Sequence, residues 1–287
     1  MARYIDPRTD FGFKRLFGQE DSKVILKQFL FDVLALAHPI QELSYIPLEQ
    51  LPKSPADRRG IYDVYCVDSM GRRFIVEMQQ GHQINIKERA LYYSTFAVTY
   101  QAQRGADWQF ELLPVYCIAI LDFLVMDESK AYLRQIQLMD INAKTVFYDK
   151  LTFVFIELLK FDQPLSELSA ADKWVYLLKH LPELQNIPAE LAAEPFTSAF
   201  AIAEEAALSP EDRWLYEGSL KQARIFNAQL AAAQMEGLQQ GLEQGLEQGR
   251  RREKFEIARS MLQRGLEPPF ILELTGLSES ELNSLTD

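Results

Sequence analysis

This chain of 287 residues has few cysteines and no long apolar run, and its basic residues are outnumbered by its acidic ones. Each of these features excludes some classes of protein. The two cysteines, Cys66 and Cys117, lie inside apolar segments, and two thiols in so long a chain do not build a disulfide framework. A reducing cytoplasm is therefore the expected location. No run of about 18 uncharged apolar residues occurs, and the opening segment lacks the apolar region of a signal peptide, so neither a membrane span nor a secretory leader is expected.

The formal net charge is −11, and almost all of the acidic excess lies in the second half of the chain. Affinity for DNA comes largely from cationic groups that displace counterions, so the net charge counts against nucleic acid as a partner. Hydrophobic residues make up 48% of the chain and aromatic residues 11%, which is enough to bury at least one large core.

The first 165 residues alternate helical and strand-like patterns. Residues 21–37 repeat apolar side chains at the spacing of a helix with one buried face, and Asp21 or Ser22 can cap it. The other expected elements are, in chain order, a weak strand over 41–51, a loop over 51–60, a two-stranded hairpin over 60–80, a long helix over 84–103, and strands over 112–121 and 147–159. This order predicts an α/β fold with a mixed central sheet flanked by helices.

Beyond about residue 165 the pattern becomes mostly helical, and it contains a four-residue repeat, EGLQQGLEQGLEQGR. In a helix each of its glycines costs about 1 kcal/mol relative to alanine, so something must offset the cost. One interpretation is a helix whose glycines form a groove for close approach of a second helix, and the other is a flexible linker. Two short helices, capped near Pro268 and at Ser278, are expected after the repeat.

The hairpin over 60–80 carries polar residues where a plain core strand would not. If Ser69, Met70 and Gly71 form a three-residue loop with glycine in the left-handed conformation, then Asp63 lies opposite Glu77. Opposed side chains on one face have Cβ atoms about 5 Å apart, and Gln79 shares the face of Glu77.

Two carboxylates and an amide therefore converge in this register. Opposed like charges destabilise a hairpin, whereas Mg²⁺ or Mn²⁺ between Asp63 and Glu77 would turn repulsion into coordination. The alternative is an ordinary half-buried strand, in which these carboxylates face solvent or form ion pairs with a nearby basic side chain such as Arg89.

An acidic residue on one strand, a short turn and a Glu-x-Lys-like triplet on the next, with helices before and after, resembles the PD-(D/E)XK nuclease superfamily. The segments that carry a closer likeness, to the PD-(D/E)XK nuclease family transposases or Rpn recombination-promoting nucleases, are DPRTDFGFKRLFG, YDVYC, FIVEMQ, ERALYYSTFAVTYQAQRG, LLPVYCIAILDF and the tail IARSMLQRGLEPPFILELTGLSESEL. Gln79 stands where the superfamily usually has lysine. A glutamine at this position is normal in the subfamily that the sequence resembles. The resemblance implies a restriction-endonuclease-like core over 1–165, a helical extension over 166–235, and a glycine-repeat helix with a short helical tail over 236–287.

The resemblance also implies the roles of the site residues. Asp63 and Glu77 would bind one or two Mg²⁺ or Mn²⁺ ions, with the backbone carbonyl of Met78 as a further ligand, and Gln79 would orient a water. Further candidates are Asp10 near the site, with helix capping as its alternative role, Lys87 and Arg89 as phosphate contacts, Tyr93 as a supporting or stacking residue, and the loop pair Arg58 and Arg59.

Three functions stay open on this basis. The first is a metal-dependent DNA endonuclease of the recombination type, which forms a homo-oligomer through its C-terminal helices. The second is a catalytically weak or inactive protein of the same fold that acts in binding or assembly, as the acidic second half and the missing lysine suggest. The third, a transposase that transfers strands, has little support, although the segment TGLSESEL resembles a reduced helix-turn-helix.

Overall fold

The computed structural model describes residues 2–46, 62–81, 85–102, 110–125 and 129–285. The chain divides into two compact units, Met1–Ile225 and Phe226–Asp287, and each has a hydrophobic core of its own. The expected loop over 51–60, with Arg58 and Arg59, lies outside the described residues. The division into 1–165, 166–235 and 236–287 remains a prediction.

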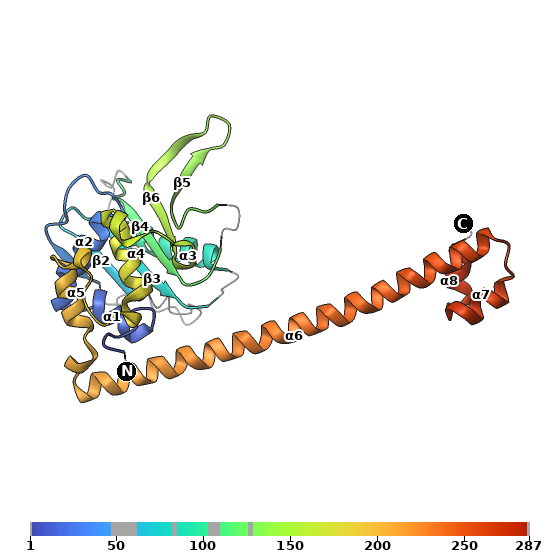
Figure 1. Ribbon diagram of the computed structural model, residues 1–287. Coiled ribbons are helices and arrows are strands. Elements are labelled where there is room, and N and C mark those ends of the chain that lie inside the picture. Colours follow the sequence, from blue (N-terminus) through green and yellow to red (C-terminus); the bar gives the residue numbers. More distant parts are fainter. Residues whose placement is uncertain (1, 47–61, 82–84, 103–109, 126–128, 286–287) are drawn as a thin grey trace, which may run out of the picture. The chain divides into compact units, whose positions relative to one another are not determined.

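A six-stranded mixed sheet forms the centre of the first unit (Figure 1). In chain order its strands are β1 (Leu43–Tyr45), β2 (Val64–Asp68), β3 (Arg73–Gln79), β4 (Val115–Leu121), β5 (Leu133–Asp140) and β6 (Thr145–Glu157), and across the sheet they follow the order β1-β2-β3-β4-β6-β5. The neighbours β3, β4 and β6 are parallel, and the other pairs are antiparallel. β4 is apolar throughout and almost entirely buried, as a parallel strand covered on both faces requires.

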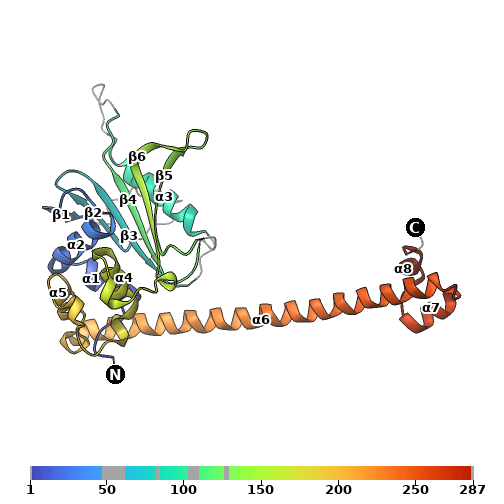
Figure 2. The same ribbon diagram turned by 45° about the horizontal axis from the view of Figure 1, so that its top comes forward.

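Helices cover both faces of this sheet (Figures 1 and 2). One face packs against α1 (Asp10–Phe17), α2 (Lys23–Val33), α4 (Ala170–His180) and α5 (Phe196–Ala203), and the other packs against α3 (Ile86–Thr99). The larger core centres on Trp174, which is fully buried between Phe29 and Phe196. The predicted α/β fold with a mixed sheet and flanking helices is confirmed.

Short 3₁₀ helices connect several of these elements. They are η1 (Glu20–Ser22), η3 (Leu158–Lys160), η4 (Leu165–Glu167), η5 (Leu181–Glu183), η6 (Ala189–Leu191) and η7 (Glu205–Ala207). The helix expected over 21–37 is α2, and Ser22 is its N-cap residue without a side-chain capping bond.

The hairpin has the predicted register. Val64 lies opposite Val76, and the Asp68 amide donates to the Arg72 carbonyl at 3.1 Å. Gly71 has φ +77°, the left-handed conformation that closes a three-residue loop. Continued by one residue, the pairing sets position 63 opposite 77.

Two elements were not expected from the sequence, α1 and β5. Asp10–Phe17 is too short to show much periodicity, and it begins where the Thr9 hydroxyl accepts the Gly12 amide hydrogen at 3.1 Å. β5 reads LRQIQLMD and keeps much of its surface exposed, so its alternation of polar and apolar residues is irregular. Pairing with β6, which the isolated segment cannot reveal, makes it a strand.

The glycine repeat is helical, which corrects the alternative of a flexible linker. It lies within α6 (Pro210–Gln263), and a methyl group built on any of its glycines would meet no described atom within 4 Å. In the second unit α6 packs through Ala258 against α7 (Pro268–Thr275) and α8 (Glu279–Asn283). The Ser278 hydroxyl caps α8, as the sequence predicts.

No helix in the described part of the chain has the length and apolarity needed to cross a bilayer.

Candidate active site

The candidate site lies at the end of β3, on the sheet face that α3 covers. Glu77 and Gln79 alternate with Val76 and Met78, which point into the larger core. Asp63 immediately precedes β2 and meets this end of β3 across the hairpin. The turn therefore sets the register, and the register brings the acidic residues together.

Asp63 is held by the backbone of the opposite strand. Its Oδ2 accepts a hydrogen bond from the Met78 amide at 2.7 Å. Burial raises the pKa of the Asp63 carboxyl group to about 6, although this hydrogen bond and the positive charge of Lys14 act in the opposite direction. The hydrogen bond fixes the carboxylate beside the backbone of the Glu77-Met78-Gln79 triplet.

Glu77 is the more costly of the two carboxylates to ionise. It is only 5% exposed, and burial raises its pKa to about 8; Arg89 lowers that pKa and the nearby Asp63 raises it further. Its Oε2 accepts a hydrogen bond from Gln79 Nε2 at 3.3 Å. Its Oε1 is buried and has no hydrogen-bond partner among the described residues. A buried acceptor without a partner is costly, so a cation or a donor from outside the described residues is expected to satisfy it.

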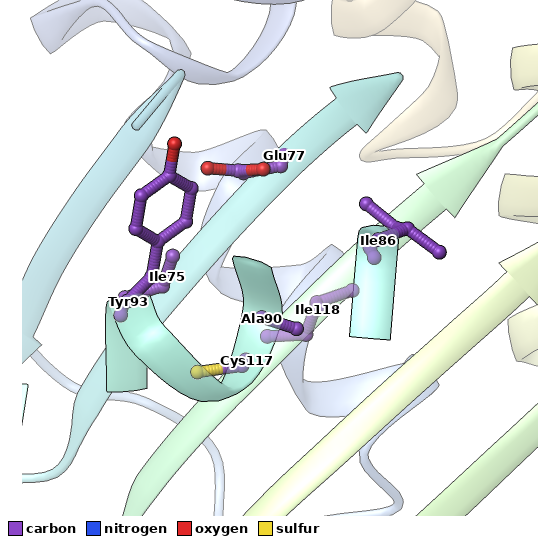
Figure 3. Close-up of a pocket in the computed structure, with 8 residues that line it drawn as sticks. Ile75, Glu77, Ile86, Ala90, Tyr93, Cys117 and Ile118 are labelled. Atoms are coloured by element: carbon purple, nitrogen blue, oxygen red, sulfur yellow. The ribbon is translucent and has the colours of Figure 1, made fainter. Parts of the chain in front are cut away.

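Arg89 and Tyr93 approach Glu77 from α3, one turn apart on the same side of the helix. Arg89 Nη2 lies 3.7 Å from Glu77 Oε2, and Arg89 Nη1 donates to Gln79 Oε1 at 3.4 Å. The guanidinium also stacks on the Tyr93 ring, 5.4 Å from its centre, and donates to the Tyr93 hydroxyl at 3.2 Å. Figure 3 shows Tyr93 and Glu77 on the same side of a mostly apolar pocket between α3, β3 and β4.

The other candidates are less closely engaged. Asp10 begins α1, where Thr9 is the capping residue, and it forms an ion pair with Lys14 at 2.6 Å. Both charges act on the pKa of Asp63, so α1 brings them into its neighbourhood. Lys87 is exposed on the first turn of α3, two positions from Arg89, and it makes no described contact with the carboxylates.

Asp122 is a neighbour of the site that was missed from the sequence. It follows β4, its amide donates to the Gln79 carbonyl at 3.3 Å, and its Oδ1 accepts from the Gly81 amide at 2.7 Å. Burial raises the pKa of Asp122, while the Gly81 hydrogen bond opposes this. The available signal was an aspartate directly after the apolar run VYCIAIL, because ends of adjacent parallel strands share one sheet edge.

The donor set suits a hard divalent cation held by few protein ligands. Mg²⁺ keeps several waters and is often bound by one or two carboxylates plus phosphate, and two carboxylates with one unsatisfied buried oxygen fit that pattern. In the described residues there is no group of three or more His, Cys, Asp or Glu side chains that could hold a metal. Among the described side chains, a cation here would depend on Asp63 and Glu77, with backbone or solvent oxygen as further ligands.

The mixed sheet, its flanking helices and the two carboxylates, one just before β2 and one near the end of β3, agree with the PD-(D/E)XK nuclease class. Residues 7–233 match the family described as PD-(D/E)XK nuclease family transposase. The chain therefore belongs to the PD-(D/E)XK nuclease family transposases, as the resemblance predicts. Residues 251–287 match the C-terminal HTH domain of the Rpn/YhgA-like nuclease family. No curated protein and no solved structure matches the chain.

Proposed function

We propose that the protein is a metal-dependent DNA endonuclease of the recombination-promoting type, which hydrolyses phosphodiester bonds. One observation carries the proposal: the buried Glu77 and the half-buried Asp63 adjoin each other, both have carboxyl groups with raised pKa values, and the Glu77 Oε1 lacks a hydrogen-bond partner among the described residues. A carboxylate pair of this kind with a purely structural role would destabilise the fold and would bring no compensating interaction. A site that binds a divalent ion explains why both are present.

Asp63 and Glu77 would hold Mg²⁺ or Mn²⁺, with the Met78 carbonyl as a further ligand. When bound, the ion supplies Lewis-acid polarisation of the scissile phosphate and lowers the pKa of a bound water. The hydrogen bond from the Met78 amide keeps Asp63 in place for this task.

Gln79 would orient the attacking water through its amide group. An amide can donate or accept a hydrogen bond, but it carries no positive charge with which to stabilise the anionic transition state. Activity is therefore expected to depend steeply on the concentration of divalent ions. Lys87 would contact phosphate, Tyr93 would support the site, and Asp10 would add negative charge from α1.

DNA is the proposed partner of both units: the first would cut it, and the second contains an HTH domain, which is a common DNA-binding module.

We also infer a homo-oligomer formed through the C-terminal helices, since the glycine face of α6 and the exposed leucines Leu238, Leu242 and Leu246 offer a surface for a second helix. Two buried free cysteines fit the reducing cytoplasm as its location.

The test is plasmid cleavage with Mg²⁺, with Mn²⁺ and with a chelator, by the wild type and by Asp63→Ala and Glu77→Ala. Asp162→Ala removes an exposed carboxylate outside the site and serves as the matched control. We expect metal-dependent cleavage by the wild type and the control, and a loss of at least about a hundredfold in the two site variants. Cleavage that survives in both site variants would refute this assignment.

A second function is favoured by the missing lysine and by the acidic excess: a catalytically weak protein that acts in binding or assembly. Absence of both metal binding and cleavage from every variant, the wild type included, would support it over the nuclease. Isothermal titration with Mn²⁺ provides the metal-binding measurement, and it needs no DNA.

A further inference from the structure

Arg89 lies beside the Glu77 carboxylate, close to where a cation bound to Glu77 would lie. Its guanidinium approaches Glu77 Oε2 at 3.7 Å and Gln79 Oε1 at 3.4 Å, so it contacts two of the three site residues of β3. Mg²⁺ binds carboxylate oxygen at about 2.1 Å, which would set the ion within a few ångströms of the guanidinium. Two like charges at that separation repel strongly inside a protein.

We propose that Arg89 is a displaceable internal cation: it lies against Glu77 in the metal-free protein, yields to the divalent ion, and then binds a non-bridging phosphate oxygen of the DNA. This inference rests on the proposed function. It joins the two interpretations that the sequence left as alternatives, a counter-ion for Glu77 and a phosphate contact, as successive states of one side chain.

The contacts of Arg89 are suited to release. Its separation from Glu77 is too long for a hydrogen bond, and its bond to Gln79 is near the upper limit of length. Of the contacts described above, the shortest is the hydrogen bond to the hydroxyl of Tyr93 on its own helix, whose ring the guanidinium also faces. We therefore expect Tyr93 to hold the guanidinium when it leaves Glu77, and the Arg89 side chain is already 29% exposed.

This role would also explain how the protein can work with glutamine at position 79, where the superfamily usually has lysine. Gln79 supplies no positive charge where lysine is usual, and Arg89 brings a permanent positive charge to the same amide from α3. The planar guanidinium matches the geometry of two phosphate oxygens, which a lysine ammonium does not. Charge would thus reach the transition state from the helix and not from the strand.

The test measures Mn²⁺ affinity by isothermal titration without DNA, for the wild type, Arg89→Gln and Arg89→Met. Removal of the competing cation is expected to lower the dissociation constant at least about threefold in both neutral variants. Arg89→Lys, which keeps the charge, should bind Mn²⁺ like the wild type. Lys221→Gln removes one exposed positive charge from α6 and should also be unchanged.

Cleavage at saturating Mn²⁺ is the second measurement. The neutral variants are expected to cut at least about tenfold more slowly than the wild type although they bind metal more tightly, because they lack the phosphate contact. A residue that only supported the fold would weaken both properties together. Melting temperatures identify a variant that fails to fold. If one neutral variant fails to fold, the Mn²⁺ affinity and cleavage rate of the other neutral variant test the proposal.

Equal or weaker Mn²⁺ binding by the neutral variants would overturn the inference, and so would unchanged cleavage at saturating metal. Glu77→Gln separates this failure from that of the proposed function. If the wild type binds Mn²⁺ and Glu77→Gln does not, the metal site stands even when Arg89 proves irrelevant to it. If the wild type binds no Mn²⁺, both proposals fall.

Discussion

Replacement of Glu77 by glutamine should stabilise the metal-free protein, although it removes a proposed catalytic group. The pKa of the folded-state carboxyl is about 8, against 4.5 ordinarily, because burial penalises the charged form. A raised folded-state pKa means that the native protein binds the proton more tightly than the unfolded chain. Stability from this group is therefore complete below pH 4.5 and is lost as the pH rises toward 8.

The size of the effect follows from linkage. With these two pKa values the group lowers the free energy of unfolding by about 1 kcal/mol at pH 5, about 3 kcal/mol at pH 7 and about 5 kcal/mol well above pH 8. Glutamine has no proton to lose, so Glu77→Gln is expected to remove this dependence. The pKa of Asp63 is also raised, and that group titrates in the same direction in both proteins.

Urea unfolding in the presence of a chelator, at half-unit steps from pH 5 to pH 8, measures the difference. Fluorescence of the fully buried Trp174 reports on the first unit. Glu88→Gln, which replaces an exposed carboxylate on α3, is the matched control and should follow the wild type. Parallel stability curves for Glu77→Gln and the wild type over this range would refute the reasoning. Mn²⁺ should then stabilise the wild type and leave Glu77→Gln unchanged.

Two further predictions concern glycines. Gly71→Ala should lower the free energy of unfolding by about 1–2 kcal/mol in urea, because φ is +77° and the new methyl would lie 2.3 Å from Leu113 Cδ1; equal stability would contradict this. The double variant Gly241→Leu with Gly245→Leu should raise helix content by circular dichroism, and by filling the proposed groove of α6 it should lower the mass found by light scattering. A mass equal to that of the wild type would show that the glycines are not at an interface.

The approach of Asp63 to Glu77 could be predicted because local chemistry decides it. A glycine at the third loop position selects the loop length, the loop length sets the pairing, and the two-residue period of a strand then places Glu77 and Gln79 on one face. Each of these steps depends on neighbouring residues alone. The helices over 21–37 and 84–103 were predictable for the same reason, since their apolar spacing is local.

Contacts between elements distant in sequence could not be predicted in this way. The sequence shows that Arg89 lies on a helix after β3, but the packing of α3 decides that it reaches Glu77 and not solvent. Asp122 joins the site only because β4 lies parallel to β3 in matching register. α1 brings Asp10 and Lys14 near Asp63 through a core shared with α2 and α5, which no periodicity reports.

The net charge, which counts against DNA as a partner, is less telling once its distribution is considered. The last 23 residues, 265–287, contain five acidic side chains and neither lysine nor arginine, so α7 and α8 bring no cation of their own to a phosphate. The preceding end of α6 carries exposed arginines at 250, 252 and 259, and an exposed Arg264 directly follows the helix. Contact with a phosphate depends on such local groups, because charges more than about 10 Å apart are largely screened in salt. Net charge governs solubility and the rate of encounter instead, and it leaves phosphate contact to the side chains that line each surface.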